Sequence, residues 1–214
     1  MKTVVVKDND LSYAVETLLR GGLVGVPTET VYGLAGNGLN AEAVAKIYEV
    51  KGRPAIKPLS LLVPGLEVVE KFTSIIPESA RLLAEAFWPG PLTMVLPRND
   101  MVPDIVTAGG ETVGVRCPDH PKTLEFLRLA GVPAAAPSAN IFDLPSPKCA
   151  QDVLSYFDGL IDCVIDGGVC TLGVESTLVL LSSEPGYYKI IRQGALPEEE
   201  IAKVLGMERR IIDI

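Results

Sequence analysis

Short apolar runs alternate with amphipathic segments along this chain of 214 residues. Short runs rich in valine, leucine and isoleucine are typical of buried strands, whereas apolar residues three or four positions apart are typical of helices. The pattern predicts strands near residues 3–6, 23–27, 59–63, 92–96, 112–116, 133–136, 161–165, 174–181 and 187–192. It predicts helices near residues 10–20, 40–51, 66–72, 77–87, 120–130, 147–157 and 197–205.

Capping residues support several of these helix boundaries. Asn40 is a good N-cap for the segment AEAVAKIYEVK, and Gly52 follows its last residue. Ser146 followed by Pro147 is typical of an N-cap and first-turn pair, so we expect the helix near 147–157 to begin there. His120 stands immediately before a proline at the start of another predicted helix, where a structural role is expected.

The order of these elements predicts an α/β fold. Strands and helices are interspersed, yet residues 174–192 form two adjacent strands, so the sheet should mix parallel and antiparallel pairs. No internal repeat or low-complexity linker divides the chain. We therefore expect a single domain over residues 1–206 and a short tail at 207–214. No apolar run suits a secretory signal or a membrane span, which favours a cytoplasmic protein.

Composition excludes several classes of function. The formal net charge is −8, which argues against broad, non-specific binding to nucleic acid. The four cysteines form no CxxC pair, and the single histidine excludes zinc sites with several histidine ligands. P-loop, Rossmann and GxSxG motifs are missing from the sequence.

Four hydroxyl-rich or charged turns stand at the ends of predicted strands: PTETVYG, TVGVRCP, APSAN and GVEST. Each alone could be an ordinary turn, but ligands of α/β proteins gather at such strand ends. Cations accompany these turns. Lys51, Arg53 and Lys57 follow a predicted helix, and Arg116 and Arg192 end apolar strands. This combination favours a polyanionic ligand.

Taken together, the motifs resemble those of the YrdC-type threonylcarbamoyl-adenylate synthase family. The matching pieces are PTETVYGL, KGRP, PLSLLV, WPGPLT, TVGVRCPDHP, APSAN, PSP, DGG, GVEST and IIRQGA, and they run in family order from about residue 10 to 205. The length is similar to the short, single-domain form. The resemblance implies a twisted mixed sheet flanked by helices, with a concave, positively charged cleft.

The resemblance also implies an activity. Members join L-threonine, bicarbonate or CO2, and ATP into threonylcarbamoyl-adenylate and pyrophosphate, with Mg2+ carried by the ATP phosphates. Partner proteins then transfer the product to adenosine 37 of tRNAs that read ANN codons. Catalysis would rest on positioning and electrostatics, with Lys51 and Arg53 acting without a side-chain nucleophile.

Site roles follow from the matched motifs. L-threonine would contact Thr30, Arg116, Ala136 and Ser176. ATP would contact Lys51, Arg53, Lys57, Thr112, Ser138, Asn140, Ser146 and Arg192. The segment 141–148 is the candidate for a closing loop. Glu29 is expected to hydrogen-bond within its own turn, with a contact to the substrate ammonium as the alternative.

One departure and two alternatives accompany this resemblance. Leu62 stands where many relatives carry a histidine near the amino-acid pocket. The chain could instead be a module of the same fold that binds tRNA or double-stranded RNA without catalysis. A carbamoyltransferase of the hydrogenase-maturation type is less compatible, because those chains are long and carry cysteine pairs.

Overall fold

The structure, a computed structural model, describes residues 2–7, 10–182 and 187–206, and the predicted tail at 207–214 lies outside them. The strands are β1 (Val4–Val6), β2 (Val24–Val26), β3 (Gly33–Asn37), β4 (Ser60–Leu62), β5 (Leu92–Pro97), β6 (Thr112–Arg116), β7 (Ala134–Ala135), β8 (Cys163–Ile165), β9 (Thr177–Leu181) and β10 (Tyr188–Arg192). The helices are α1 (Ser12–Leu19), α2 (Ala41–Lys51), α3 (Glu78–Phe87), α4 (Asp104–Thr107), α5 (Pro121–Ala130), α6 (Ala150–Phe157) and α7 (Glu198–Leu205), with a 3-10 helix at Leu66–Lys71.

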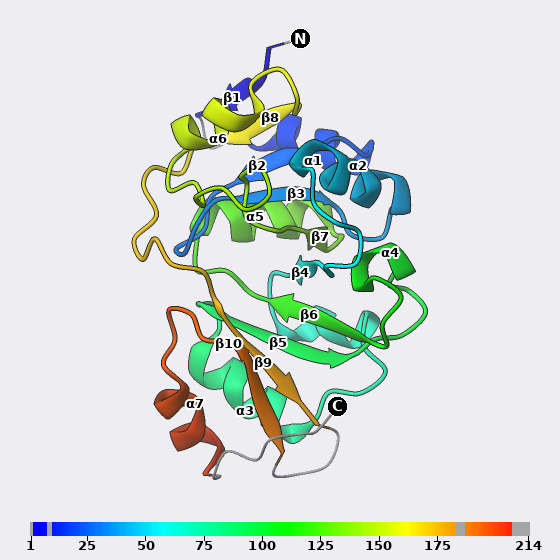
Figure 1. Ribbon diagram of the computed structural model, residues 1–214, viewed down its shortest axis with the longest axis vertical. Helices are drawn as coiled ribbons and strands as arrows, with labels where there is room; N and C mark the ends of the chain where they lie inside the picture. Colours follow the sequence, from blue (N-terminus) through cyan, green and yellow to red (C-terminus); the bar gives the residue numbers. More distant parts are fainter. Residues whose placement is uncertain (1, 8–9, 183–186, 207–214) are drawn as a thin grey trace.

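The described strands form one ten-stranded sheet in the order β1-β8-β2-β3-β7-β4-β6-β5-β9-β10. Four neighbouring pairs are parallel and five are antiparallel. Figure 1 shows how the strands turn progressively from β1 at one end of the molecule to β10 at the other. The expected mixed α/β sheet is thus confirmed.

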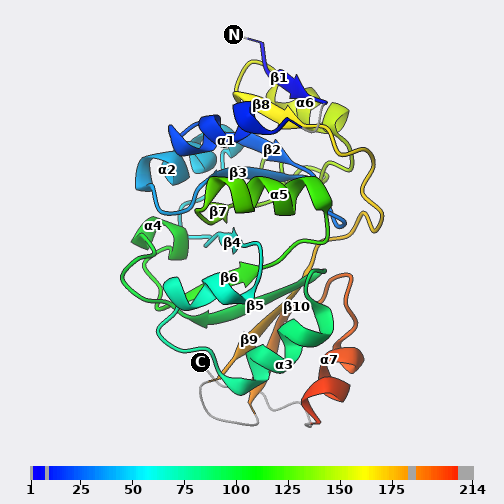
Figure 2. The same cartoon turned by 180° about the vertical axis from the view of Figure 1, so that it is seen from behind.

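Helices cover both faces of this sheet, as the two opposite views show (Figures 1 and 2). Helices α1 and α5 pack together through Leu18 and Phe126, both of them fully buried. Strand β2 divides its side chains between the two faces. Val24 joins the cluster under α1 and α5, while an added Cβ at Gly25 would lie 3.2 Å from Val153 of α6. The polar turns that leave the strands are therefore attached to a framework packed on both sides.

Strand β3 was not predicted from the sequence, because its residues GLAGN were interpreted as part of a turn. The glycines that gave this impression permit close packing within the sheet. A Cβ at Gly36 would lie 3.1 Å from Ile47 of α2, and one at Gly38 would lie 2.6 Å from Leu61 of β4. Side chains at these two positions would therefore collide with neighbouring elements.

Two other boundaries differ from the prediction. Helix α6 begins at Ala150 with Cys149 as its N-cap, so the prediction that Ser146 caps it was wrong. The Ser146 hydroxyl donates instead to Glu175, 2.6 Å away. The single-turn helix α4 was also missed, as one turn is too short to show a helical period. By contrast, Asn40 caps α2 by accepting from two backbone N–H groups, and Gly52 ends it in the left-handed conformation (φ 61°), both as predicted.

Candidate functional site

A cleft of about 210 Å³ opens on the sheet face that carries β4, β5, β6 and β9. The register of the strands determines which residues form the floor of this cleft. Leu62 of β4 pairs with Arg116 of β6, Thr93 of β5 pairs with Leu178 of β9, and Leu178 pairs with Arg192 of β10. Strands β5 and β6 are antiparallel, and Met94 pairs with Val115. Thr93, one residue before Met94, therefore stands opposite Arg116, one residue after Val115. Cross-strand partners project from the same face of a sheet, so these five residues form a row.

The opposite wall is formed by the turn between β2 and β3. The Thr28 hydroxyl donates to the Val31 carbonyl at 2.6 Å, and the Thr30 hydroxyl lies 2.8 Å from the Thr28 oxygen. A hydroxyl carries one proton, and that of Thr28 is already committed, so Thr30 is the donor in the second bond. The Thr30 oxygen therefore offers lone pairs, and no proton, to a ligand in the cleft.

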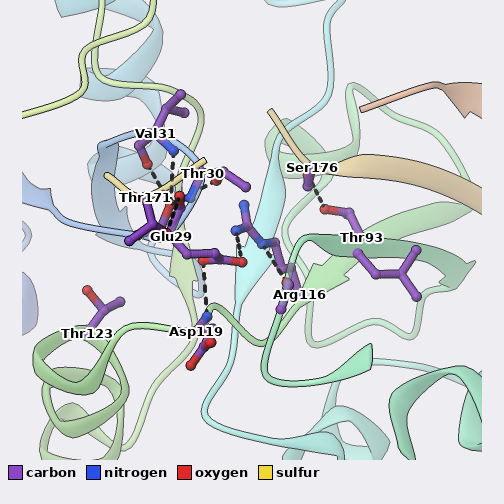
Figure 3. A network of polar contacts seen from close by, with 12 residues as sticks. Glu29, Thr30, Val31, Thr93, Arg116, Asp119, Thr123, Thr171 and Ser176 are labelled. Atoms are coloured by element: carbon purple, nitrogen blue, oxygen red, sulfur yellow. Dashed lines mark hydrogen bonds and ion pairs between the residues drawn. The ribbon is translucent and has the colours of Figure 1, made fainter. Parts of the chain in front are cut away.

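Arg116 is held at the centre of the site by a buried ion pair. Its Nη2 lies 2.7 Å from Glu29 Oε1, and the two side chains are only 8% and 7% exposed. Its Nε donates to the Gly90 carbonyl at 3.2 Å, and the other oxygen of Glu29 accepts the Asp119 N–H at 3.1 Å. Figure 3 shows Glu29 between Arg116 and Asp119. Glu29 is thus bound to an arginine of the site, a pairing that neither expectation for this residue included.

Ser176 connects two strands of the cleft floor. Its hydroxyl lies 2.8 Å from that of Thr93, and its carbonyl accepts from Arg192 Nε at 3.2 Å and Nη2 at 2.9 Å. Next to it, the Glu175 carboxylate lines the cleft, and the hydrogen bond from Ser146 is the main reason that the pKa of Glu175 lies below its ordinary value. These contacts fix the GVEST turn against the β10 strand.

Lys51 lies behind the cleft instead of in it. Its side chain is 1% exposed, and its ammonium donates to the carbonyls of Ser138 and Asn140, each 2.5 Å away. Burial lowers the pKa of Lys51 to about 7, and the charge of Arg53 adds to this effect. The two carbonyls oppose the shift because they stabilise the ammonium form. In this structure Lys51 therefore braces the PSAN turn from behind.

The remaining cations divide between the cleft and its surroundings. Arg53 lines the cleft, and its guanidinium donates back to the Lys57 carbonyl at 3.2 Å and the Pro58 carbonyl at 3.1 Å. The ammonium of Lys57 instead lies 4.5 Å from the ring centroid of Phe142, in the segment predicted to close the site. Burial is the main cause that lowers the pKa of Arg53.

The cleft brings together most of the residues that the sequence singled out. All four residues expected at L-threonine line it, and so do three of those expected at ATP: Thr30, Arg116, Ala136, Ser176, Arg53, Ser138 and Arg192. Leu62 lines it beside Arg116. The others lie outside its lining: Lys51, Lys57, Thr112, Asn140 and Ser146.

Ser146 is connected to the cleft by a hydrogen bond, the side chain of Asn140 bonds to residues outside the cleft lining, and Thr112 lies apart from the cleft. Ser146 is one hydrogen bond away, through Glu175. Asn140 is buried, and its amide nitrogen donates to Ile141 and Leu144 at 2.8 and 2.7 Å. Thr112 is exposed at the far end of β6 from Arg116, opposite Pro97. Thr112 therefore lies apart from Arg53, Ser138 and Arg192 in this structure, and its contact with ATP stays a prediction.

Sequence reasoning missed several residues that the structure places in the cleft, among them Thr28, Ser60, Thr93, Glu175 and Leu178. Thr93 stands in the WPGPLT motif, and a hydroxyl near the start of an apolar run was a usable signal. Leu178 gave no such signal, because an apolar residue within a strand looks like core until the register is known.

Metal and membrane features were searched in the described part of the chain. No group of three or more histidine, cysteine, aspartate and glutamate side chains there could hold a metal ion. None of the helices described is long and apolar enough to cross a bilayer.

The fold and the cleft define an α/β protein with a cleft lined by arginines and hydroxyl groups on the face of a mixed sheet. A family model described as Telomere recombination, which covers the Sua5, YciO and YrdC proteins, matches residues 16–194. The chain belongs to this family.

Individual relatives carry a common name. The chain is 50% identical over 186 residues to the threonylcarbamoyl-AMP synthase of Pyrococcus abyssi, covering 87% of this chain and 54% of that protein. It is 34% identical over 195 residues to a putative threonylcarbamoyl-AMP synthase of Methanocaldococcus jannaschii, covering 90% and 89%. The crystal structure of P. abyssi Sua5 complexed with L-threonine superimposes with a TM-score of 0.92 at 45% identity, over 98% of this chain and 62% of that one. The chain thus spans little more than half of the length of its P. abyssi relative.

Proposed function

We propose that this protein is an L-threonylcarbamoyladenylate synthase, a nucleotidyltransferase that makes threonylcarbamoyl-AMP and pyrophosphate from L-threonine, bicarbonate or CO2, and ATP. One observation carries the proposal. The charged side chains that line the cleft are three arginines and one glutamate, set among hydroxyl groups on one sheet face. Such a concave, positively charged surface suits two anionic substrates, an amino-acid carboxylate and a triphosphate.

L-Threonine is placed at the end of the cleft where Arg116 and Thr30 face each other. Arg116 has donors left over after its bonds to Glu29 and Gly90, and they would take the substrate carboxylate. The Thr30 oxygen is an acceptor, which suits the substrate amine. Ala136 and Ser176 complete the pocket, and Leu62 offers apolar surface beside Arg116. The crystal structure of a relative complexed with L-threonine supports L-threonine as the amino-acid substrate.

The nucleotide is placed toward Arg53 and Arg192, which lie on segments from different parts of the chain. Both guanidiniums are attached to backbone carbonyls, so they would meet the phosphates already oriented. Ser138 also lines the cleft and would contribute to the nucleotide site. Lys51 would act through the Ser138 and Asn140 carbonyls that it holds, and Ser146 through Glu175. Lys57 would reach the phosphates only after leaving the Phe142 ring.

The reaction requires no nucleophile from the protein. The amine of L-threonine would capture CO2, and the carbamate oxygen would attack the α-phosphorus of ATP, releasing pyrophosphate. The protein would contribute positioning and the stabilisation of negative charge that develops on the phosphoryl oxygens. Arg53 and Arg192 are the groups best placed for the second task.

Further features belong to the same proposal. Mg2+ would enter with the ATP phosphates and keep much of its water shell. The product would pass to proteins that transfer the threonylcarbamoyl group to tRNA in the cytoplasm, and tRNA would contact this protein at the cleft. The segment 141–148 would close over the adenylate, and its attachment through Ser146 to Glu175 gives it a contact across the cleft rim.

Pyrophosphate release is the direct test. We expect release from ATP only when L-threonine and bicarbonate are both present, and a loss of at least tenfold in Arg116→Ala. Equal turnover with glycine or serine would contradict the assignment of L-threonine. No turnover at all, together with tight binding of tRNA, would favour the RNA-binding alternative.

A further inference from the structure

We propose that Glu29 is a positioning residue that orients Arg116 for the substrate carboxylate. The inference rests on the proposed function, since it concerns the same pocket. Glu29 does not line the cleft, and its side chain is 7% exposed, so its effect on substrate must pass through another residue. That residue is Arg116, which lines the cleft and lies 2.7 Å from Glu29.

The hydrogen bonds leave Arg116 one orientation that satisfies its partners. Its Nε donates to Gly90 and one Nη2 proton to Glu29, so the two bonds fix the plane and the direction of the guanidinium group. The remaining N–H groups, on Nη1 and Nη2, have no protein partner among the described residues. A fixed guanidinium with a free pair of donors can bind a carboxylate in the bidentate manner without a cost in side-chain ordering.

A carboxylate is required at position 29, and a neutral amide would not serve. One oxygen of Glu29 accepts from Arg116, and the other accepts the Asp119 N–H at 3.1 Å. The end of a glutamine side chain has one acceptor oxygen and one donor NH2 group. Since Arg116 and the Asp119 N–H are both donors, the NH2 group would face one of them without forming a hydrogen bond. Glu29→Gln would therefore loosen Arg116 or displace the turn at Asp119.

The backbone of Glu29 strengthens this position. Its carbonyl accepts from the Leu172 N–H at 2.8 Å and from the Thr171 hydroxyl at 3.4 Å. Glu29 thus joins the β2–β3 turn to the segment before β9, while its side chain reaches the end of β6 (Figure 3). Arg116 is oriented from a point that three segments of the chain hold together.

Orientation and charge predict opposite effects, which makes the inference testable. Removing the negative charge of Glu29 would leave Arg116 more attractive to an anion, so a purely electrostatic account requires tighter binding of L-threonine by Glu29→Gln. The positioning account requires weaker binding. Glu29→Asp keeps the charge and both acceptor oxygens on a shorter side chain, so it should restore part of the lost affinity.

The experiment measures L-threonine binding by calorimetry and the kinetics of pyrophosphate release in the complete chain. We expect Glu29→Gln to raise the Kd and KM for L-threonine at least tenfold, with the KM for ATP changed less than threefold. Glu29→Asp should lie between this variant and the unaltered protein. Unchanged or tighter threonine binding by Glu29→Gln would overturn the inference.

Asp162 provides a matched control. Its carboxylate also accepts from one arginine and one backbone N–H, at 3.4 Å from Arg20 and 2.9 Å from Leu23, but it lies outside the cleft lining. Asp162→Asn and Glu29→Gln should both lower Tm, whereas only the latter should change threonine affinity. Equal losses of affinity in the two variants would assign the effect to general destabilisation and contradict positioning.

A second readout separates this inference from the proposed function. The Nε–H signal of Arg116, observed by NMR in the protein without substrates, should be slow to exchange and should lose this protection in Glu29→Gln. If the unaltered protein binds no L-threonine, the proposed function fails, while this signal still tests the positioning. Equal protection in both proteins would overturn the role of Glu29 whatever the substrate.

Discussion

The burial of Lys51 predicts that the stability of the folded protein depends on pH. The ammonium is 1% exposed, and burial lowers its pKa from 10.5 to about 7. Between these two values the unfolded chain holds a proton that the folded chain has released, so stability should rise with pH in this window. The slope approaches about 1.4 kcal/mol for each pH unit.

The perturbation is Lys51→Met, which keeps most of the length of the unbranched side chain and removes the titrating group. Urea unfolding of both proteins at pH 7.5 and pH 9.5 gives the change in stability that belongs to Lys51 alone. Between these pH values we expect the free energy of unfolding to rise by about 2–3 kcal/mol more in the unaltered protein than in the variant. Lys203→Met, at an exposed lysine of α7, should produce no such gain.

Parallel curves for the two proteins would refute this reasoning. They would mean that the carbonyls of Ser138 and Asn140 stabilise the ammonium as well as water does, so that Lys51 keeps its proton through neutral pH. A gain in the opposite direction would be incompatible with burial as the dominant cause.

Three further expectations concern the cleft. Ser146→Ala removes the hydrogen bond that is the main cause of the lowered pKa of Glu175, so NMR titration should show that pKa rising, and an unchanged value would contradict the contact. Gly194→Ala would place a Cβ 2.3 Å from the Glu175 carbonyl oxygen and 2.4 Å from the Ser176 carbonyl carbon. We expect it to cost about 1–3 kcal/mol in urea unfolding and to reduce threonine-dependent turnover, whereas full stability would show that the GVEST turn gives way easily. Chelation of Mg2+ by EDTA should abolish pyrophosphate release and excess Mg2+ should restore it, whereas persistent release would exclude a role for the ion.

Most elements of the fold could be predicted from apolar patterning and caps. The segment AEAVAKIYEVK shows a helical period between Asn40 and Gly52, and the structure places the helix at Ala41–Lys51. Strand β3 could not be predicted in this way, because its glycines are selected by the neighbours they touch and not by strand propensity. Ser146 was misplaced because its best partner, Glu175, lies 29 positions away in the sequence.

The sequence predicted those residues of the candidate site that are polar and stand at the ends of apolar strands. Arg116, Thr30 and Ser176 are polar residues at the ends of apolar strands, and all three line the cleft. Burial behind the cleft could not be inferred, so Lys51 was expected to face the ligand. The partner of Glu29 was equally hidden, since the ion pair joins residues 87 positions apart.

The five residues that form a row on the floor of the cleft determine when the folding chain can first bind substrates. The members of this row come from five strands, and the last of them, Arg192 in β10, follows Leu62 by well over half of the described chain. Strands β4, β5, β6 and β9 are aligned by pairings between segments that are distant in the sequence, whereas β10 pairs with its neighbour β9. The distant pairings form slowly because the loops between them must first be ordered. During synthesis from the N-terminus, the nascent chain therefore has no complete arginine-lined floor until residue 192 has been made and has joined β9. Partly made chains should consequently not bind substrates at this site.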